Sequence, residues 1–190
     1  GILNSLVKEI NALSNIDCKV IGNGLWITSS NPFQIEALEA DLFNIVADEV
    51  NDVTSLPTTC RHGYIVKVTN SGQLTEDDHY LKFEGNDGLD GNGVWTECAK
   101  PGIQTSFNTS TMPVVLTHTS GTNFTLGGYL KPNGDSAWTI RDVGDTETNK
   151  APSFVDKKIE KLLLHRDRLV ALSGTNVIMS SPDNIGNFWN

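Results

Sequence analysis

Residues 153–190 read SFVDKKIEKLLLHRDRLVALSGTNVIMSSPDNIGNFWN, and this stretch decides the fold class. It contains three short apolar runs separated by turn residues: Leu162–Leu164, Leu169–Leu172 and Val177–Met179. Runs of this length and spacing are typical of consecutive antiparallel strands. At the end of this stretch, the last strand has an open edge that needs a partner strand, and the rings of Phe188 and Trp189 need a core in which to be buried. Since the chain also begins at Gly1 without an initiator methionine, we expect it to be a piece of a larger β-rich protein.

Composition points to a globular chain with many turns. The 190 residues are 38% hydrophobic and 19% charged, with 17 Gly. Abundant Thr, Asn, Ser and Gly favour strands joined by turns over long helices. No apolar run approaches the ~20 residues that a membrane span needs. Cys18, Cys60 and Cys98 lack metal-site spacing and are odd in number, which favours free thiols made in a reducing cytoplasm.

The net charge is −9 and the isoelectric point about 4.8. Such a surface repels phosphates, so we expect no specific binding of nucleic acid. Basic residues nevertheless gather late in the chain and suit either a solvated hairpin or a contact with an acidic neighbouring subunit. They are Lys150, Lys157, Lys158, Lys161, Arg166 and Arg168.

The overall prediction is an α+β fold that is predominantly antiparallel β. Apolar residues at helical spacing predict an amphipathic helix with a buried stripe over residues 2–14, followed by a hairpin around Gly22-Asn23-Gly24. A central meander should use residues 64–69, 79–84 and 93–98, and a further hairpin should turn at Ser120–Asn123. We expect three segments: 1–56 (helix plus strands), 57–128 (central meander) and 129–190 (linker and propeller-like hairpins).

Residues 33–53 allow two interpretations. Phe33/Ile35 and Phe43/Ile45 fit alternating strands, whereas helical periodicity fits Ile35, Leu38, Leu42, Ile45, Val46, Val50 and Val53. Both interpretations stay open, and Ser55-Leu56-Pro57 should end the segment.

Five blocks of sequence form a recognisable series: SLPTTCRHGYIVKVTNS (55–71), EDDHYLKFEG (76–85), GVWTECAKPGI (93–103), TMPVVLTH (111–118) and HRDRLVALSGTNVIMSS…NFW (165–189). These blocks resemble the tail tubular protein B family, the nozzle proteins of short-tailed, podovirus-type phages, and they occur in the family's order. Val170 and Ala171 stand where the family often has Gly, and His79 stands where Tyr is usual. The insert GNDGLDGNG at 85–93 resembles forms from phages of marine bacteria.

The resemblance implies a structural virion protein without catalytic activity or cofactors. It implies a ring, hexameric at full length, that forms and closes the distal DNA-ejection channel. It also implies contacts with the tail adaptor and tail fibres, passage of DNA without specific binding, and assembly in the host bacterial cytoplasm. For the fold, it implies that the C-terminal strands belong to an incomplete β-propeller. The alternative function is a carbohydrate-binding or polysaccharide-degrading tail module.

Several local patterns could carry chemistry, and each also has a plain structural reading. Residues Asn86–Glu97 imitate part of a calcium loop, with Asp90 and Glu97 at ligand positions, but a Gly/Asp-rich hairpin loop explains them better. Glu76–His79 could pair carboxylates, yet a solvated turn is the simpler reading. The Cys60/His62 pair lacks an oxyanion context. We therefore predict no catalytic, cofactor-binding or metal residues.

Aromatic and acidic residues give two further hypotheses. Trp26, Trp95, Trp138 and Trp189 should pack in cores, and Tyr129 and Trp138 are the candidates for an exposed subunit contact. In a channel that passes DNA, an acidic wall would let the duplex slide, because it does not bind the phosphates. The candidates for such a wall or seam, or for a merely solvated acidic surface, are Asp48, Glu49, Asp52, Asp77 and Asp78.

Overall fold

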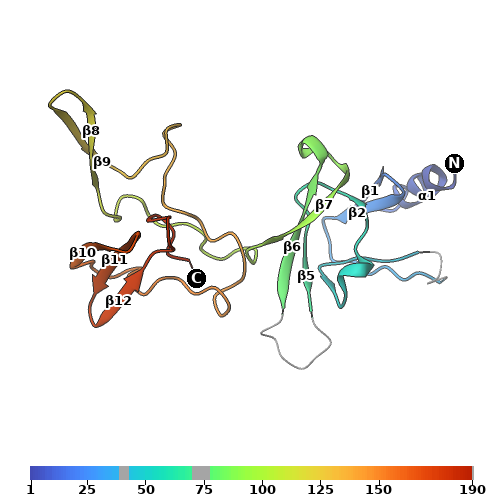
Figure 1. Cartoon of the computed structure of the whole chain (residues 1–190). Coiled ribbons are helices and arrows are strands. Elements are labelled where there is room, and N and C mark those ends of the chain that lie inside the picture. Colours follow the sequence, from blue (N-terminus) through green and yellow to red (C-terminus); the bar gives the residue numbers. More distant parts are fainter. Residues whose placement is uncertain (39–42, 70–77, 190) are drawn as a thin grey trace. The chain divides into compact units, whose positions relative to one another are not determined.

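A computed structural model describes residues 1–38, 43–69 and 78–189 (Figure 1). The described residues are mostly strands and turns with one α-helix, and the sheets are largely antiparallel, as predicted. The chain divides into two compact units, Gly1–Cys98 and Ala99–Asn190. The three-segment division at residues 56 and 128 stays a prediction.

The N-terminal helix α1 spans Ile2–Ile10. Its apolar stripe is half-buried and none of its residues is fully buried, so the expected buried stripe forms only in part. The helix is also shorter than the predicted 2–14, and Leu13 is left 57% exposed. The Asn11 side chain explains the early end: it accepts a hydrogen bond from Cys18 N (2.7 Å) and donates one to Cys18 O (3.0 Å). An Asn that binds neighbouring backbone in this way competes with helix continuation.

The first hairpin joins β1 (Ile16–Ile21) to β2 (Gly24–Ser29) and confirms the predicted turn. Gly22 has φ +59°, the positive value that a two-residue hairpin turn needs at its first central position. A Cβ at Gly22 would also lie 2.6 Å from the Thr59 Cβ. Glycine is therefore needed at this turn for both conformation and space.

The first unit is built around a five-stranded sheet in the order β3-β5-β6-β7-β4. The predicted meander forms its centre as β5 (Ile65–Val68), β6 (His79–Gly85) and β7 (Gly91–Cys98). The edges are the two-residue strands β3 (Glu49–Val50), parallel to β5, and β4 (Thr59–Cys60), antiparallel to β7. Short 3-10 turns at Val53–Ser55 and Asn86–Gly88 complete the unit.

The core of this unit is valine and aromatic. Val50, Val66 and Val68 are buried together, with Leu81 and Trp95 packed against them. Phe83 is fully buried, and its ring meets that of Trp95 edge-on at 5.2 Å. The Tyr64 hydroxyl donates to Ala47 O (2.8 Å), and burial, first among several causes, raises the pKa of Tyr64 to about 12. This phenol therefore stays protonated and acts as a structural donor.

The β6–β7 ladder depends on a close approach at Gly93. Gly93 lies opposite Gly85, and a Cβ added to it would sit 2.3 Å from Glu84 O and 2.7 Å from Gly85 Cα. Backbone atoms cannot rotate away, so Gly93→Ala should destabilise the first unit by about 1–3 kcal/mol in urea unfolding. Gly24→Ala, whose nearest neighbour would be Ile21 O at 3.7 Å, is the control. Equal stability of the two variants would contradict the close-approach argument.

The described residues of 33–53 match neither interpretation drawn from the pattern. Residues 33–38 and 43–48 contain no helix or strand, and the only strand in the described part of this segment is β3. Phe33 and Ile35 are exposed, and Leu38 is 100% exposed. Leu42 lies outside the described residues. The helical spacing gives no helix over 33–38 because its large apolar side chains are exposed, whereas Val46 and Val50 reach the valine core without one.

The second unit has two separate small sheets. The hairpin of β8 (Val115–Ser120) and β9 (Asn123–Gly127) turns where predicted. The C-terminal runs form an antiparallel sheet in the order β10-β11-β12, with β10 at Lys161–His165, β11 at Arg168–Ser173 and β12 at Asn176–Met179. This confirms the three strands predicted from residues 153–190.

Aromatic rings from distant parts of the second unit form its core. Trp189 stacks on Phe107 with centroids 4.8 Å apart, and Phe154 meets Phe188 edge-on at 5.1 Å. Met112, Trp138 and Ala171 complete the buried cluster. No helix in the described residues has the length and apolarity to cross a bilayer.

Candidate functional site

The loop that imitates a calcium site holds its unit together instead. Asp90 accepts a hydrogen bond from Lys19 Nζ (2.8 Å) through one carboxylate oxygen and from His62 N (2.9 Å) through the other. Asp90 thereby ties β1 and the 61–63 turn to the start of β7. Both oxygens of the candidate ligand are already engaged.

Glu97 cannot join Asp90 around one ion. It lies near the far end of β7, seven residues further along an extended strand. At about 3.3 Å per residue, the two positions are separated by roughly 23 Å. Within residues 1–38, 43–69 and 78–189, no group of three or more His, Cys, Asp or Glu residues could hold a metal ion. The geometry supports the interpretation of residues Asn86–Glu97 as a Gly/Asp-rich hairpin loop rather than a calcium site.

The role of Asp90 gives a pH-dependent prediction. The hydrogen bond from Lys19 and then that from His62 N hold the pKa of Asp90 below its usual value. A carboxyl group with a lowered pKa in the folded state stabilises the fold above its unfolded pKa of about 3.9, and this contribution is lost as pH falls through the folded pKa. Asp90→Asn should therefore lower stability at pH 7, and the deficit should begin to shrink below about pH 4 and vanish once the pH lies below the lowered pKa of Asp90.

Urea unfolding at pH 7, 5 and 3 measures this deficit, with Asp87→Asn as the matched control. Asp87 is exposed in the same loop at φ +56°, a conformation that Asn tolerates. A deficit of Asp90→Asn that persists unchanged at pH 3 would show that the carboxylate charge is not the stabilising feature.

The acidic cluster at 76–79 divides between described and undescribed residues. Glu76 and Asp77 lie outside the described residues. Asp78 forms an ion pair with Lys67 Nζ at 2.6 Å, and its side chain is only 12% exposed. The hydrogen bond that Lys67 Nζ donates to Asp78 is the main cause of the raised pKa of Lys67. Asp78 is therefore a structural ion-pair partner of Lys67 on β5. Among the described residues of the 76–79 cluster, Asp78 is the only carboxylate.

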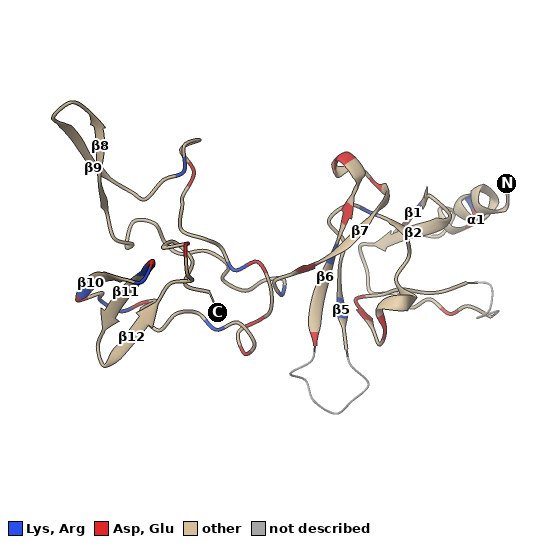
Figure 2. Ribbon diagram, in the orientation of Figure 1, with Lys and Arg blue, Asp and Glu red and all other residues tan. Residues whose placement is uncertain are grey.

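The other acidic candidates for a channel wall lie around β3. Asp48 and Glu49 flank the start of the strand, and Asp48 O accepts a hydrogen bond from Lys67 N (2.8 Å). Asp52 caps the turn Val53–Ser55 by accepting from Thr54 N (2.8 Å), which lowers the pKa of Asp52. Figure 2 shows acidic residues near this turn and at the start of β6. All three side chains are exposed.

The Cys60/His62 pair has no features of a nucleophilic site. Cys60 is buried on β4, and burial raises the pKa of its thiol, which disfavours the reactive thiolate. His62 Nδ1 accepts a hydrogen bond from Gly85 N (3.2 Å), so the ring is used to hold the β6 end. Cys18 and Cys98 are likewise free thiols whose pKa is raised by burial.

The tryptophans serve packing, as predicted. Trp138 and Trp189 are buried, and Trp26 and Trp95 are half-buried against Tyr64. The expectation of an exposed Trp138 is wrong, because its ring packs between Tyr129 and Phe188. Tyr129 is half-buried against the same core. Neither residue offers a free aromatic surface.

Sequence reasoning missed the buried Arg141. Its guanidinium lies 4.6 Å from the Trp189 ring centroid, and the residue is 2% exposed. Its Nε and Nη1 atoms have no hydrogen-bond partner among the described residues. The local sequence around Arg141 carries no signal of this burial, because the Trp189 contact is long-range.

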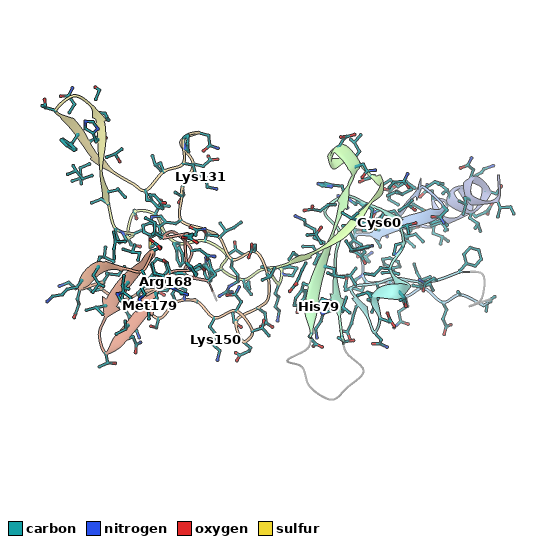
Figure 3. The ribbon with its side chains drawn as sticks, in the orientation of Figure 1. Cys60, His79, Lys131, Lys150, Arg168 and Met179 are labelled. Carbon is teal, nitrogen blue, oxygen red and sulfur yellow. The ribbon has the colours of Figure 1, made fainter. Side chains whose placement is uncertain are left out.

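Five of the six late basic residues are exposed: Lys150, Lys157, Lys158, Lys161 and Arg166. Lys150 is exposed and Arg168 is half-buried, with Arg168 Nη1 donating to Ser180 O (3.0 Å) (Figure 3). Arg166 lies in the β10–β11 turn at φ +47°. These positions suit a solvated hairpin, and the contact with an acidic subunit stays a prediction.

The most prominent unpartnered surface is the β8–β9 hairpin. We call residues 114–128 the β8–β9 arm; every residue from Leu116 to Gly128 is exposed. The arm lies inside a run of thirty residues, 101–130, without any Asp, Glu, Lys or Arg, although 19% of the chain is charged. The sequence alone could have revealed this charge-free run, but sequence reasoning missed it.

A groove lies in the same unit as the arm. It has a volume of about 370 Å³, and half of its ten lining residues are apolar: Phe107, Met112, Phe154, Val155 and Ile159. The uncharged polar residues Gln104, Asn108 and Thr111 also line it. Asp156 and Lys157 bring one charge of each sign to it. A groove of this lining fits an apolar side chain better than a charged one.

Comparison with known proteins identifies the class. The sequence matches the bacteriophage nozzle protein family over residues 1–190, so the chain belongs to that family. It is similar to the tail tubular protein gp12 of Escherichia phage T7, with 27% identity over 176 residues, which cover 89% of this chain. The match covers 21% of that relative, so the chain spans about a fifth of its length.

Proposed function

We propose that the chain is a structural part of a phage tail nozzle and acts by packing and self-assembly rather than by catalysis. The observation that carries this proposal is the family match over all 190 residues. The candidate reactive groups are consistent with it, because Cys60, Asp78 and Asp90 are each buried or engaged in structural contacts. The protein would be a tail component of the virion, assembled in the host cytoplasm.

In the proposed assembly, copies of the full-length protein form a ring, a hexamer, around the distal end of the DNA channel. The ring joins the tail adaptor, helps to anchor the tail fibres and keeps the channel closed until ejection. The sheet β10-β11-β12 would supply strands to a β-propeller, and its exposed leucines support this role. Leu162, Leu163 and Leu164 on β10 are 42%, 46% and 72% exposed, so they remain available to a neighbouring sheet.

The acidic surface around β3 suits a channel that passes DNA. Asp48, Glu49 and Asp52 are exposed, and exposed carboxylates do not hold phosphates. In the intact phage, replacing the three by Asn and Gln should slow ejection if they face the channel. Unchanged ejection kinetics would place this surface away from the DNA path.

Electron microscopy of the purified full-length protein tests the ring proposal. We expect a toroid with six-fold symmetry and no hydrolysis of host polysaccharide. A monomer with turnover of host glycan would replace the nozzle proposal by the carbohydrate-degrading alternative. A monomer without turnover would refute ring formation by this protein on its own.

A further inference from the structure

We propose that the β8–β9 arm of one copy docks into the groove lined by Phe107, Met112, Phe154 and Ile159 on the next copy of this chain. This inference rests on the proposed ring and assigns the surfaces that close it. A ring requires two different complementary patches on each subunit, because a contact of a patch with itself gives only a pair. The arm and the groove are two such patches.

The arm is built as an element that needs a partner. Its two strands form a sheet of their own, so among the described residues both outer edges lack a neighbouring strand (Figure 1). An isolated hairpin of this kind is marginally stable in water. Proteins normally protect open edges with charged residues, and the arm has none. A surface that covers the arm would stabilise the hairpin and protect its open edges.

One face of the arm is apolar. The register pairs Leu116 with Leu126 and His118 with Phe124, so these four side chains share a face. Leu116, Phe124 and Leu126 are 64%, 58% and 70% exposed. The His118 and Phe124 rings lie 5.1 Å apart and stiffen the end near the turn. Thr117 and Thr125 pair on the opposite face. The apolar face is therefore the docking face.

Charge favours a second copy as the occupant. Two chains of net charge −9 repel each other, so a contact between copies is favoured where neither surface carries a net negative charge, and in the groove Lys157 balances Asp156. The charge-free run 101–130 supplies the whole arm and also Phe107 and Met112 of the groove. Nucleic acid is a poor occupant, because the arm has no Lys or Arg to contact phosphates.

The groove has room for an anchor from the arm. Its volume of about 370 Å³ lies at the lower end of the range for sites that hold small apolar groups. A single aromatic side chain in an apolar pocket is the usual centre of a protein interface. Phe124, near the end of the arm, is the residue that we assign to this position.

The contact should be weak in one pair and strong in a closed ring. The arm contributes about half of the 20–30 residues that each side of a standard interface uses. In a ring, each copy gives one arm and receives one, and closure makes the final contact intramolecular. We therefore expect the 190-residue chain to associate only at high concentration.

Cysteine cross-linking between two variants of the 190-residue chain tests the pairing. One variant carries Phe124→Cys on the arm and the other Asn108→Cys at the exposed rim of the groove. The unchanged chain is the control, since it carries Cys18, Cys60 and Cys98 and reports their background. Under oxidation, we expect a linked dimer when the two variants are mixed and background levels from either variant alone.

Other cross-linking results overturn the pairing. A Phe124→Cys dimer that forms without the other variant would show arm-to-arm contact. In a chain that carries both substitutions, an exclusively intramolecular link would show the arm folding back on its own groove. Background levels in all samples, at concentrations where light scattering shows association, would place the contact elsewhere.

A charge scan in the full-length protein separates this inference from the ring proposal. Leu126→Asp puts a charge on the apolar face, and Thr125→Asp puts the same charge on the opposite face of the same strand. We expect Leu126→Asp to weaken ring formation at least tenfold, the effect of losing a central contact, and Thr125→Asp to leave it intact. Rings that form equally with Leu126→Asp refute the arm but not the nozzle. Unchanged protein that forms no rings refutes the proposed function itself.

Discussion

Phe83→Ala should cost the first unit about 3–5 kcal/mol of unfolding free energy, the range for removing a buried Phe. Phe83 is 0% exposed, and its ring packs edge-on against Trp95 at 5.2 Å. Its backbone also joins two segments, because Phe83 N donates to Tyr64 O and Phe83 O accepts from Gly63 N, both at 2.8 Å. The free energy of unfolding of a domain is only about 5–15 kcal/mol, so the variant should lose a large part of it.

Urea unfolding followed by Trp fluorescence measures this loss, and Phe33→Ala is the control in the same unit. Phe33 is 42% exposed, so its removal should change stability by no more than about 0.5 kcal/mol. If Phe83→Ala unfolds at the same urea concentration as Phe33→Ala, Phe83 is not part of the core that the side chains of β5, β6 and β7 form.

Trp189→Ala should have a similar effect on the second unit, about 3–5 kcal/mol. Three contacts are lost together: the stack on Phe107 at 4.8 Å, the hydrogen bond from Nε1 to Thr139 O at 2.8 Å, and the contact with Arg141 at 4.6 Å. Arg141 would then be a buried cation without its aromatic partner, which adds to the cost.

Hydrogen exchange read by mass spectrometry assigns this loss to a unit, because removing a tryptophan alters the fluorescence signal itself. Peptides from residues 99–189 should exchange faster in Trp189→Ala. Trp189→Phe keeps a ring on Phe107 but lacks the Nε1 donor, so its loss should be smaller, about 1–3 kcal/mol. Equal losses in the two variants would assign the stabilisation to the hydrogen bond alone.

The hairpins were predictable from sequence because turn chemistry is local. Gly22, Gly121 and Gly174 all take positive φ, as turns between short apolar runs require. Arg166 and Asp167 also have positive φ, at 47° and 60°, yet the flanking leucine runs were enough to locate their turn. Wherever consecutive strands pair, the pattern and the structure agree.

Elements that depend on distant residues were not predictable. The strands β3 and β4 have two residues each, too few to show any periodicity, and the residues of β3 pair in parallel with residues eighteen positions later. The apolar residues Phe33, Ile35 and Leu38 follow a helical spacing but are 42%, 43% and 100% exposed. Pattern reasoning assumes that spaced apolar residues face a core, and this segment breaks that assumption.

The candidate site residues show the same difference between local patterns, which sequence reveals, and long-range contacts, which it does not. Asp90 looked like a ligand because only its neighbours in sequence were visible, whereas its partner Lys19 lies 71 positions away. The rejection of Cys60 and His62 as a catalytic pair agrees with the structural roles that both residues have. The family assignment needed no single site, since five blocks in order carried it and the family match confirms it.

The sheet order β3-β5-β6-β7-β4 has a consequence for folding kinetics. The central ladders join consecutive strands, so their contacts have low sequence separation and should form early. The pairing of β4 with β7 closes a loop of about thirty residues. It should therefore form late, after Gly85 and Gly93 have paired in the β6–β7 ladder. A nascent chain leaving the ribosome can therefore complete each central ladder almost as soon as its second strand is synthesised. The pairing of β4 needs no residue beyond Asn92, so loop closure and not synthesis delays it.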